Sequence, residues 1–314
     1  MTDNRVIERI LRELAEPILG VIVGIHLVST DVNQTFLVKT NTAQYYVKLM
    51  TRKPLDLIEQ QRYLKSQMVY QKLHKKGVQS VNVLHADAEP RQFENVTIYG
   101  MMIMEKIPGQ PLDTLWESWS EEQKIEFARS FAKFLKSVHS VEFPNFGRYD
   151  PSGDNTASWV SYIRNTLERD IKRLTSHGTI PKELLSQAQS FIESHLSELQ
   201  YDYTPKLIHG DLWSGNVIYN TQTDEYVLVD WEWSIGGDPV KDLLWIDEIF
   251  YGDKDKTRIF YETYLIHDEN IGIKRRCLNI LSSIETCSIG WVFHNPSKDF
   301  FEDQAKLIRK SILG

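Results

Sequence analysis

The chain has 314 residues, of which 41% are hydrophobic and 25% are charged, as in an ordinary soluble protein of one large or two modest domains. Its formal net charge of -7 argues against a general nucleic-acid-binding protein, which needs a basic patch, whereas a nucleotide site needs only local positive charge and metal. The two cysteines, Cys277 and Cys287, suggest neither a disulfide framework nor a Cys-x-x-Cys zinc site, and we interpret both as buried reduced thiols.

The beginning of the chain shows no pattern of membrane targeting. Residues 1–14 are charged and helical in pattern, without the layout of a signal peptide. The longest charge-free run near them, residues 17–30, is too short to span a bilayer as a helix. We therefore expect a cytoplasmic protein with neither a membrane nor a nucleic acid as partner.

The first third of the chain reads as one helix followed by a small sheet. Apolar residues at helical spacing predict an amphipathic helix over residues 3–15, which Pro17 and Gly20 would end. Segments rich in Val, Ile, Phe and Tyr then predict strands of an antiparallel sheet. The predicted strands are residues 21–28, 34–40 and 45–50.

Lys48 lies in the middle of the last of these strands. Side-chain alternation places it on one face with Tyr46 and Met50. A lysine that points inward needs an anionic partner such as a carboxylate or a phosphate. From the strand alone, a solvent-facing edge lysine is the commoner alternative. The loop of residues 29–34 carries hydroxyls and amides but no glycine, so it is only weak evidence for a loop that covers phosphates.

A long helix is predicted next, over residues 55–76, with a basic last turn and a glycine stop at Gly77. Strands follow at residues 81–84 and 96–105, and the second runs into a Pro-Gly pair, which is typical of an exit from a sheet. We therefore expect a hinge between two domains near this pair. The predicted domains are residues 1–106 and 107–314.

The rest of the chain is mainly helical in pattern. Ser120 and Gln123 form a predicted capping box at the start of a helix. Residues 157–176 and 181–199 predict a helical hairpin. Beyond residue 240 the chain is helical and rich in aromatic side chains, most of which we expect in the core. A small sheet followed by helices places the protein in the α+β class.

The stretch from Leu207 to Asp242 carries the chemistry. Short apolar runs, typical of buried strands, alternate there with polar loops. Asp211 and Asn216 are five positions apart on one loop, and Asp230 follows a later strand. This is the spacing of the protein kinase catalytic loop, in which the Asp accepts a hydroxyl proton and the Asn holds magnesium. Carboxylate and amide oxygens suit Mg²⁺, which usually binds one or two carboxylates together with substrate phosphates.

The motifs of this stretch resemble those of the aminoglycoside phosphotransferase family, whose relatives include choline, fructosamine, methylthioribose and homoserine kinases. They read His-Gly-Asp-Leu-Trp-Ser-Gly-Asn at 209–216, Val-Asp-Trp-Glu-Trp at 229–233 and Gly-Asp-Pro-Val-Lys-Asp-Leu at 237–243. The resemblance covers essentially the whole chain. It implies a bilobal protein-kinase-like fold, with a small antiparallel-sheet N-terminal lobe for the nucleotide and a mainly helical C-terminal lobe for catalysis and the acceptor. The motifs are specific for the superfamily but not for a substrate.

The resemblance also implies roles for single residues. Asp211 would be the catalytic base, and Asn216 and Asp230 would bind Mg²⁺. Lys48 would contact the α- and β-phosphates of ATP or GTP, beneath a loop in which Ser29 is the expected phosphate contact.

Further implied roles concern the base of the nucleotide and the support of the loop. The adenine would meet the backbone between Met104 and Ile107, including Glu105. His209 would be a structural member of the catalytic loop. Asp238 and Asp242 would stabilise the second lobe by hydrogen bonds, Asp238 as a helix cap.

One departure from the family pattern concerns the partner of Lys48. In many members a glutamate that pairs with this lysine lies closer to the glycine that ends the helix. Those positions hold Ser66, Gln67 and Met68 in this chain. Glu59 is the remaining candidate, so the partner of Lys48 is either Glu59 or another group.

The acceptor is expected to be a small molecule, because the chain leaves no room for an activation segment after Asp230 and no Ala-Pro-Glu follows. We expect transfer of the γ-phosphoryl group to a hydroxyl, first of an aminoglycoside-type antibiotic. Carboxylates that could receive its amines are Glu232, Asp247, Glu248 and Glu262. Alternatives are a choline-, sugar- or homoserine-like metabolic acceptor, which the aromatic residues would suit, and a non-catalytic nucleotide-binding pseudokinase.

Overall fold

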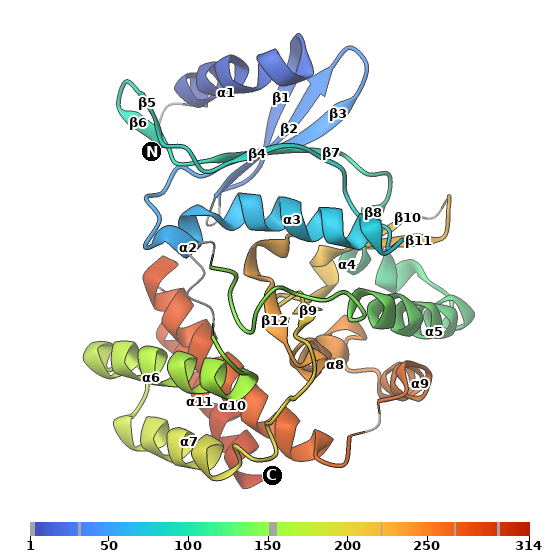
Figure 1. Ribbon diagram of the computed structural model, residues 1–314. Coiled ribbons are helices and arrows are strands. Elements are labelled where there is room, and N and C mark those ends of the chain that lie inside the picture. The colour runs from blue at the N-terminus through green and yellow to red at the C-terminus, as the bar shows by residue number, and fades with distance from the viewer. Residues whose placement is uncertain (1–3, 31–32, 151–155, 221, 267, 294–295) are drawn as a thin grey trace. The chain divides into compact units, whose positions relative to one another are not determined.

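The computed structural model describes residues 4–30, 33–150, 156–220, 222–266, 268–293 and 296–314 (Figure 1). The chain forms two compact units. Unit 1 comprises Met1–Ser118, Asp150–Ser152 and Ser214–Trp233, and unit 2 comprises Trp119–Tyr149, Gly153–Trp213 and Ser234–Gly314. These units are defined by packing, and the division into lobes at residue 106 stays a prediction.

Unit 1 is built on a five-stranded antiparallel sheet in the order β1-β2-β3-β7-β4. Its strands are β1 (Ile22–Ser29), β2 (Gln34–Thr40), β3 (Gln44–Leu49), β4 (Val83–Asp87) and β7 (Met101–Glu105). Lys48 on β3 lies opposite Thr35 on one side and Met102 on the other. The lysine therefore stands on the central strand, and the alternative of an edge lysine is wrong.

Helix α1 (Asn4–Leu19) covers this sheet with a stripe of buried apolar residues that includes Ile7, Ile10 and Leu11. The helix runs past the predicted stop at Pro17. Pro17 deprives the helix of one N–H donor, but the next turn still closes, because the Gly20 N–H donates to the Glu16 carbonyl at 2.9 Å. The helix ends before Gly20, which has a φ of +79°.

Two predicted elements are divided in the structure. The helix predicted over residues 55–76 is α2 (Leu57–Gln60) followed by α3 (Arg62–Lys75). The strand predicted over residues 96–105 is β6 (Val96–Ile98) followed by β7, and β6 pairs with β5 (Arg91–Phe93) in a separate hairpin. Tyr99 and Gly100 separate the two strands, and a Cβ at Gly100 would lie 2.7 Å from the Asp87 carbonyl oxygen.

Unit 1 also holds a three-stranded antiparallel sheet, in the order β11-β10-β8. Its strands are β8 (Gln110–Pro111), β10 (Val217–Asn220) and β11 (Glu225–Leu228). Helix α4 and the 3₁₀ helices η1, η2 and η3 complete the unit at Leu112–Leu115, Trp116–Ser118, Ser214–Asn216 and Trp231–Trp233. Gly109 lets β8 approach β10, because a Cβ there would lie 2.6 Å from the Tyr219 carbonyl oxygen.

Unit 2 is mainly helical, which confirms the predicted α+β class. Its helices are α5 (Glu121–Val138), α6 (Trp159–His177), α7 (Lys182–Ser194), α8 (Ile246–Ile249), α9 (Lys254–Tyr264), α10 (Ile271–Phe293) and α11 (Lys298–Leu313). The predicted capping box of Ser120 and Gln123 opens α5. No helix in the described ranges is long and apolar enough to cross a membrane.

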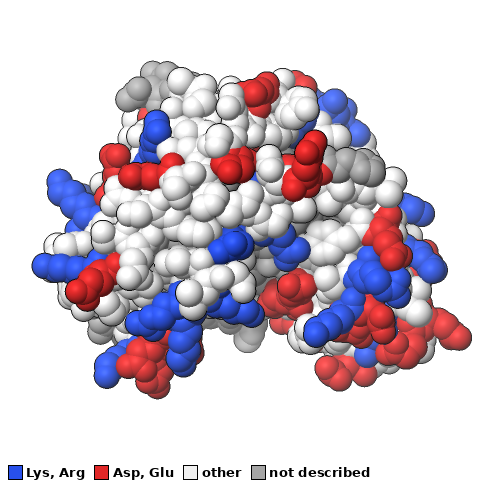
Figure 2. Space-filling model, turned by 90° about the horizontal axis from the view of Figure 1, so that it is seen from below, with Lys and Arg blue, Asp and Glu red and all other residues white. Residues whose placement is uncertain are grey.

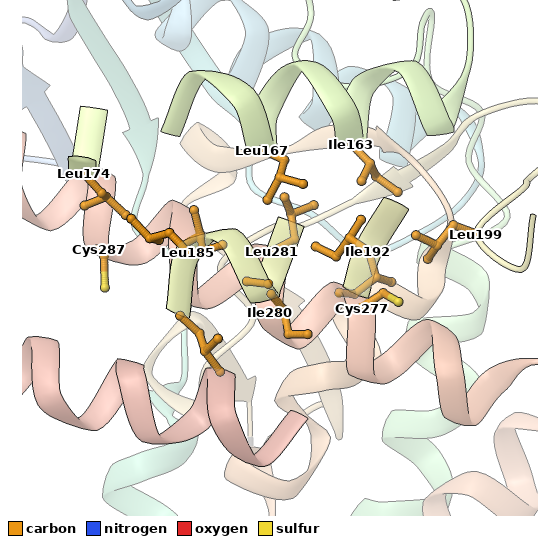
Figure 3. Packing of buried hydrophobic residues seen from close by; sticks show 14 of the residues in the cluster. Ile163, Leu167, Leu174, Leu185, Ile192, Leu199, Cys277, Ile280, Leu281 and Cys287 are labelled. Atoms are coloured by element: carbon orange, nitrogen blue, oxygen red, sulfur yellow. The ribbon is translucent and has the colours of Figure 1, made fainter. Parts of the chain in front are cut away.

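The core of unit 2 lies among α6, α7, α10 and α11 (Figure 3). Leucine and isoleucine side chains from these helices surround both cysteines there. Cys277 and Cys287 are buried and unpaired by disulfide, as predicted. Two short strands, β9 (Lys206–Ile208) and β12 (Ile235–Gly237), form an antiparallel pair in the same unit.

Candidate active site

The loop that carries Asp211 follows β9 and is anchored by one carboxylate. The backbone N–H groups of His209 and Gly210 donate to the two oxygens of Asp242, at 2.7 Å and 2.9 Å. Gly210 has a φ of +82°, a conformation that glycine adopts without strain. Asp242 lies on η4 (Pro239–Trp245), a 3₁₀ helix capped as predicted by Asp238, which accepts the Val240 N–H at 3.0 Å.

Asp242 is completely buried and remains charged. Burial alone would raise its pKa, but the interactions with His139, with His209 and with the Gly210 N–H outweigh burial, so the pKa of Asp242 is lowered. His139 Nε2 lies 3.1 Å from Asp242 Oδ2, and His139 Nδ1 lies 2.7 Å from the Tyr264 hydroxyl. Because an ionised carboxylate only accepts, His139 Nε2 carries the proton that faces Asp242.

Asp211 is half-buried at the turn of this loop. Its N–H donates to His209 Nδ1 at 3.3 Å, and its carbonyl accepts the Trp213 N–H at 3.2 Å. His209 is fully buried. These bonds fix the backbone of Asp211 on both sides.

Asn216 and Asp230 are brought together within unit 1 by the pairing of β10 with β11. Val217 lies opposite Leu228, and one step further the Val229 N–H donates to the Asn216 carbonyl at 3.0 Å. Asp230 follows directly, with a φ of +65° that turns the chain out of the strand. The backbone pairing brings the two residues close together, and their carboxylate and amide oxygens are ligand types that would suit Mg²⁺.

Lys48 joins this group from the central strand of the sheet. Its Nζ donates to Asp230 Oδ1 at 2.9 Å and to Glu232 Oε1 at 2.7 Å. Burial works against the ammonium, yet the charges of Asp230 and Glu232 hold the pKa of Lys48 well above its usual value. The lysine is therefore a permanent cation beside the proposed metal ligand.

Glu59 does not pair with Lys48. Its carboxylate accepts instead from Arg52, from Arg62 Nη2 at 2.6 Å and from the Leu55 N–H. It lies on the short helix α2, whereas the partners of Lys48 come from Asp230 and the η3 segment directly after it.

Comparison with known proteins identifies the family. Residues 27–277 match the model of the phosphotransferase enzyme family. The chain belongs to this family. Its members act as phosphotransferases with an alcohol group as acceptor. No curated protein matches the sequence.

Solved structures of phosphotransferases share the fold across the whole chain. Aminoglycoside phosphotransferase APH(4)-Ia is 15% identical, with a TM-score of 0.74 and coverage of 99% of both chains. The streptomycin–ATP–APH(2")-IIa ternary complex is 20% identical, with a TM-score of 0.66 and coverage of 99% of this chain and 97% of the other. Choline kinase LicA from Streptococcus pneumoniae is 20% identical, with a TM-score of 0.63 and coverage of 98% and 99%. These likenesses confirm the fold that the motifs predicted.

The other residues that the resemblance implied lie on the strands of the large sheet of unit 1 or directly after them. Ser29 ends β1 and is half-buried. Met104 is buried on β7, Glu105 ends that strand, and Ile107 follows it half-buried. The Glu105 N–H donates to the Asn82 carbonyl at 3.0 Å, so this N–H already has a hydrogen-bond partner within unit 1. Of the loop after Ser29, residues 31–32 lie outside the described residues.

Two side chains support predicted site residues through contacts that the sequence did not reveal. Glu232 had been considered as a ligand of the acceptor, but its carboxylate is bound to Lys48 and to Arg62 Nη1, the latter at 3.2 Å. His139 carries no motif or spacing that marks it in the sequence, and its contact with Asp242 crosses 103 positions of the chain. The position of Glu232, two residues after Asp230, was the only local feature of the sequence that could have indicated its contact with Lys48.

Proposed function

We propose that the protein transfers the γ-phosphoryl group of ATP, or of GTP, to a hydroxyl of a small molecule. Asp211 accepts the proton of that hydroxyl while the new oxygen–phosphorus bond forms and the bond to the leaving nucleoside diphosphate breaks. Asn216 and Asp230 hold Mg²⁺, which neutralises charge on the phosphates. Lys48 contacts the α- and β-phosphates.

The observation that carries this proposal is the bond of 2.9 Å between Lys48 and Asp230. It joins a central-strand lysine to the carboxylate that follows β11, across 182 positions of the sequence. A phosphoryl-transfer site needs a cation and a metal carboxylate on the same group of phosphates. A structural lysine on the outer face of the sheet would not explain this pairing.

Two backbone N–H groups of the stretch proposed to contact the nucleotide base are already hydrogen-bonded within the protein. The N–H groups of Glu105 and Lys106 donate to the carbonyls of Asn82 and Gln44, at 3.0 Å and 3.1 Å. Within the proposed stretch from Met104 to Ile107, the Ile107 backbone is therefore the better candidate for the adenine. Ser29 is the proposed contact to the phosphates.

The first proposed acceptor is an aminoglycoside-type antibiotic, and a metabolic alcohol is the second candidate. The metabolic alcohol is favoured because carboxylates that were expected to bind the amines of an aminoglycoside are paired with cations of the protein. Asp247 lies 3.7 Å from Arg275, Glu262 lies 2.9 Å from Arg258, and Glu232 is bound to Lys48. On the face seen in Figure 2, cations and carboxylates are intermixed, so this face offers a polycation no surface of one sign.

The function is tested by nucleoside diphosphate release with ATP and with GTP across aminoglycosides, macrolides, choline and sugar alcohols. We expect Mg²⁺-dependent turnover with one acceptor class. Asp211→Asn should lower kcat by about 10³-fold, because it removes the general base, while nucleotide still raises the Tm. Exposed Asp202→Asn is the matched control. If nucleotide raises the Tm but no acceptor is phosphorylated, the pseudokinase alternative holds instead.

A further inference from the structure

Glu232 occupies the position that a helix glutamate was expected to fill. It lies on η3, two residues after Asp230, and its side chain is 6% exposed. One oxygen accepts Lys48 Nζ at 2.7 Å, and the other accepts Arg62 Nη1 at 3.2 Å and Asn33 Nδ2 at 3.0 Å. All three donors therefore converge on one buried carboxylate.

We infer that Glu232 is the positioning residue of Lys48: it holds the ammonium where the nucleotide phosphates bind, in place of a glutamate on helix α3. This inference rests on the proposed function, in which Lys48 is the phosphate contact. Glu232 acts through Lys48 and does not itself touch the nucleotide.

Helix α3 supports this carboxylate with cations. Arg62 and Lys65 are one turn apart, so they share a face of the helix. Arg62 binds the Glu232 side chain, and Lys65 Nζ donates to the Glu232 backbone carbonyl at 2.7 Å. A helix that usually supplies a carboxylate to the lysine thus supplies two cations to Glu232, one to its carboxylate and one to its backbone carbonyl.

Glu59 contributes to this arrangement only indirectly, through Arg62. It binds Arg62 at 2.6 Å, and Arg62 binds Glu232, which binds Lys48. The side chains of Glu59, Arg62 and Glu232 are 6% to 7% exposed, so each charge depends on its neighbours for compensation. Removal of Glu59 leaves the bond between Glu232 and Lys48 in place.

The two acidic partners of Lys48 differ in access to solvent. The Asp230 side chain is 38% exposed, whereas that of Glu232 is 6% exposed. A carboxylate that must receive a metal and phosphates needs access, and a carboxylate that only orients a lysine does not. This difference assigns the metal to Asp230 and the positioning of Lys48 to Glu232.

The test is a double-mutant cycle on nucleotide binding by the full chain, measured as the Kd for ADP in EDTA and in Mg²⁺. Glu232→Gln should weaken ADP binding in EDTA by about tenfold or more, since it leaves Lys48 misplaced. The same substitution in a Lys48→Met background should have no further effect, because the two residues then act as one unit. Glu59→Gln should have a smaller effect than Glu232→Gln, and exposed Glu89→Gln serves as the matched control.

The inference would be overturned if Glu232→Gln weakened ADP binding equally in the wild-type and in the Lys48→Met backgrounds. It would also be overturned by a raised Mg²⁺ requirement with unchanged ADP binding in EDTA, which would make Glu232 a metal ligand. If Glu232→Gln does not fold because Arg62 is left unpaired, the double variant Glu232→Gln/Arg62→Met removes both charges and should show the same loss. If the wild-type protein binds no nucleotide at all, the proposed function itself is overturned. If the wild-type protein and the Glu232→Gln variant bind ADP equally well, only the inference about Glu232 is overturned.

Discussion

Asp242 shows how one buried residue sets the geometry of the loop that carries Asp211. Its two oxygens accept the N–H groups of His209 and Gly210 at 2.7 Å and 2.9 Å, and His139 lies 3.1 Å away. Hydrogen bonds to an ionised acceptor are about twice as strong as neutral ones. Asp211 therefore projects from a backbone that is held by charge-assisted bonds on its N-terminal side.

At the same scale, Asp230→Ala should abolish Mg²⁺-dependent nucleotide binding. The substitution removes the carboxylate proposed to bind the metal, and loss of even an outer-shell partner costs about 10–100-fold in metal affinity. The measurement is the rise in Tm that ATP causes with Mg²⁺ and with EDTA. Asp202→Ala controls for the loss of an exposed carboxylate. An unchanged Mg²⁺-dependent rise in Tm would remove Asp230 from the metal site.

Sequence reasoning found the residues that lie close together in a motif and missed those that meet across the chain. The spacing of Asp211, Asn216 and Asp230 is local, so a single stretch reveals it. The partner of Lys48 lies 184 positions away at Glu232, and no local periodicity encodes that contact. Glu59 was considered because the helix that precedes Gly77 holds few other carboxylates.

At the scale of elements, β12 depends on close packing that only glycine permits. The Gly236 and Gly147 backbones exchange N–H···O bonds of 2.9 Å and 2.7 Å. A Cβ at Gly236 would lie 2.0 Å from the Asn145 carbonyl oxygen, and a Cβ at Gly237 would lie 2.3 Å from the Trp159 ring. Because β12 pairs with β9, these glycines also support the strand from which the Asp211 loop emerges.

Gly236→Ala should therefore destabilise the protein, by about 1–3 kcal/mol or more, because the backbone oxygen cannot move aside as a side chain would. Gly272→Ala is the matched control: its Cβ meets nothing within 4 Å on helix α10, and alanine there should be neutral or stabilising. Urea unfolding of the two variants gives the comparison. Equal stability of both would show that β12 shifts to accommodate a methyl group.

The ends of helices and strands were predicted correctly where they depend on residues that are neighbours in the sequence. The capping box at Ser120 and the stop at Gly77 depend on neighbouring residues, and both are present. The division of a predicted strand at Gly100 depends on the approach of Asp87 from another strand. The extension of α1 past Pro17 reflects packing of the helix on the sheet, which outweighs the one lost hydrogen bond.

At the scale of the whole molecule, the core of unit 2 gives a probe of global unfolding. Cys277 and Cys287 are 1% and 0% exposed, and they stand on α10 among side chains of three other helices. Burial raises the pKa of each thiol to about 12. The reactive thiolate is therefore both rare and inaccessible in the folded protein.

A water-soluble thiol reagent at pH 8 should accordingly label neither cysteine at an appreciable rate in native buffer. Both should react when urea unfolds the protein, with a midpoint that matches the loss of circular dichroism. The single variants Cys277→Ala and Cys287→Ala separate the two sites. Rapid labelling of one thiol in native buffer would show that the helices around it open without global unfolding.

The anchoring of the Asp211 loop has a consequence for the order in which the protein folds. Asp242 lies 33 positions after His209 and 103 positions after His139. Bonds between such distant segments form only after the intervening chain has been brought together, which costs loop-closure entropy. We therefore expect the loop to acquire its shape only once helix α5, strand β9 and η4 have assembled, so that a partly folded chain would contain helices before it gains catalytic competence.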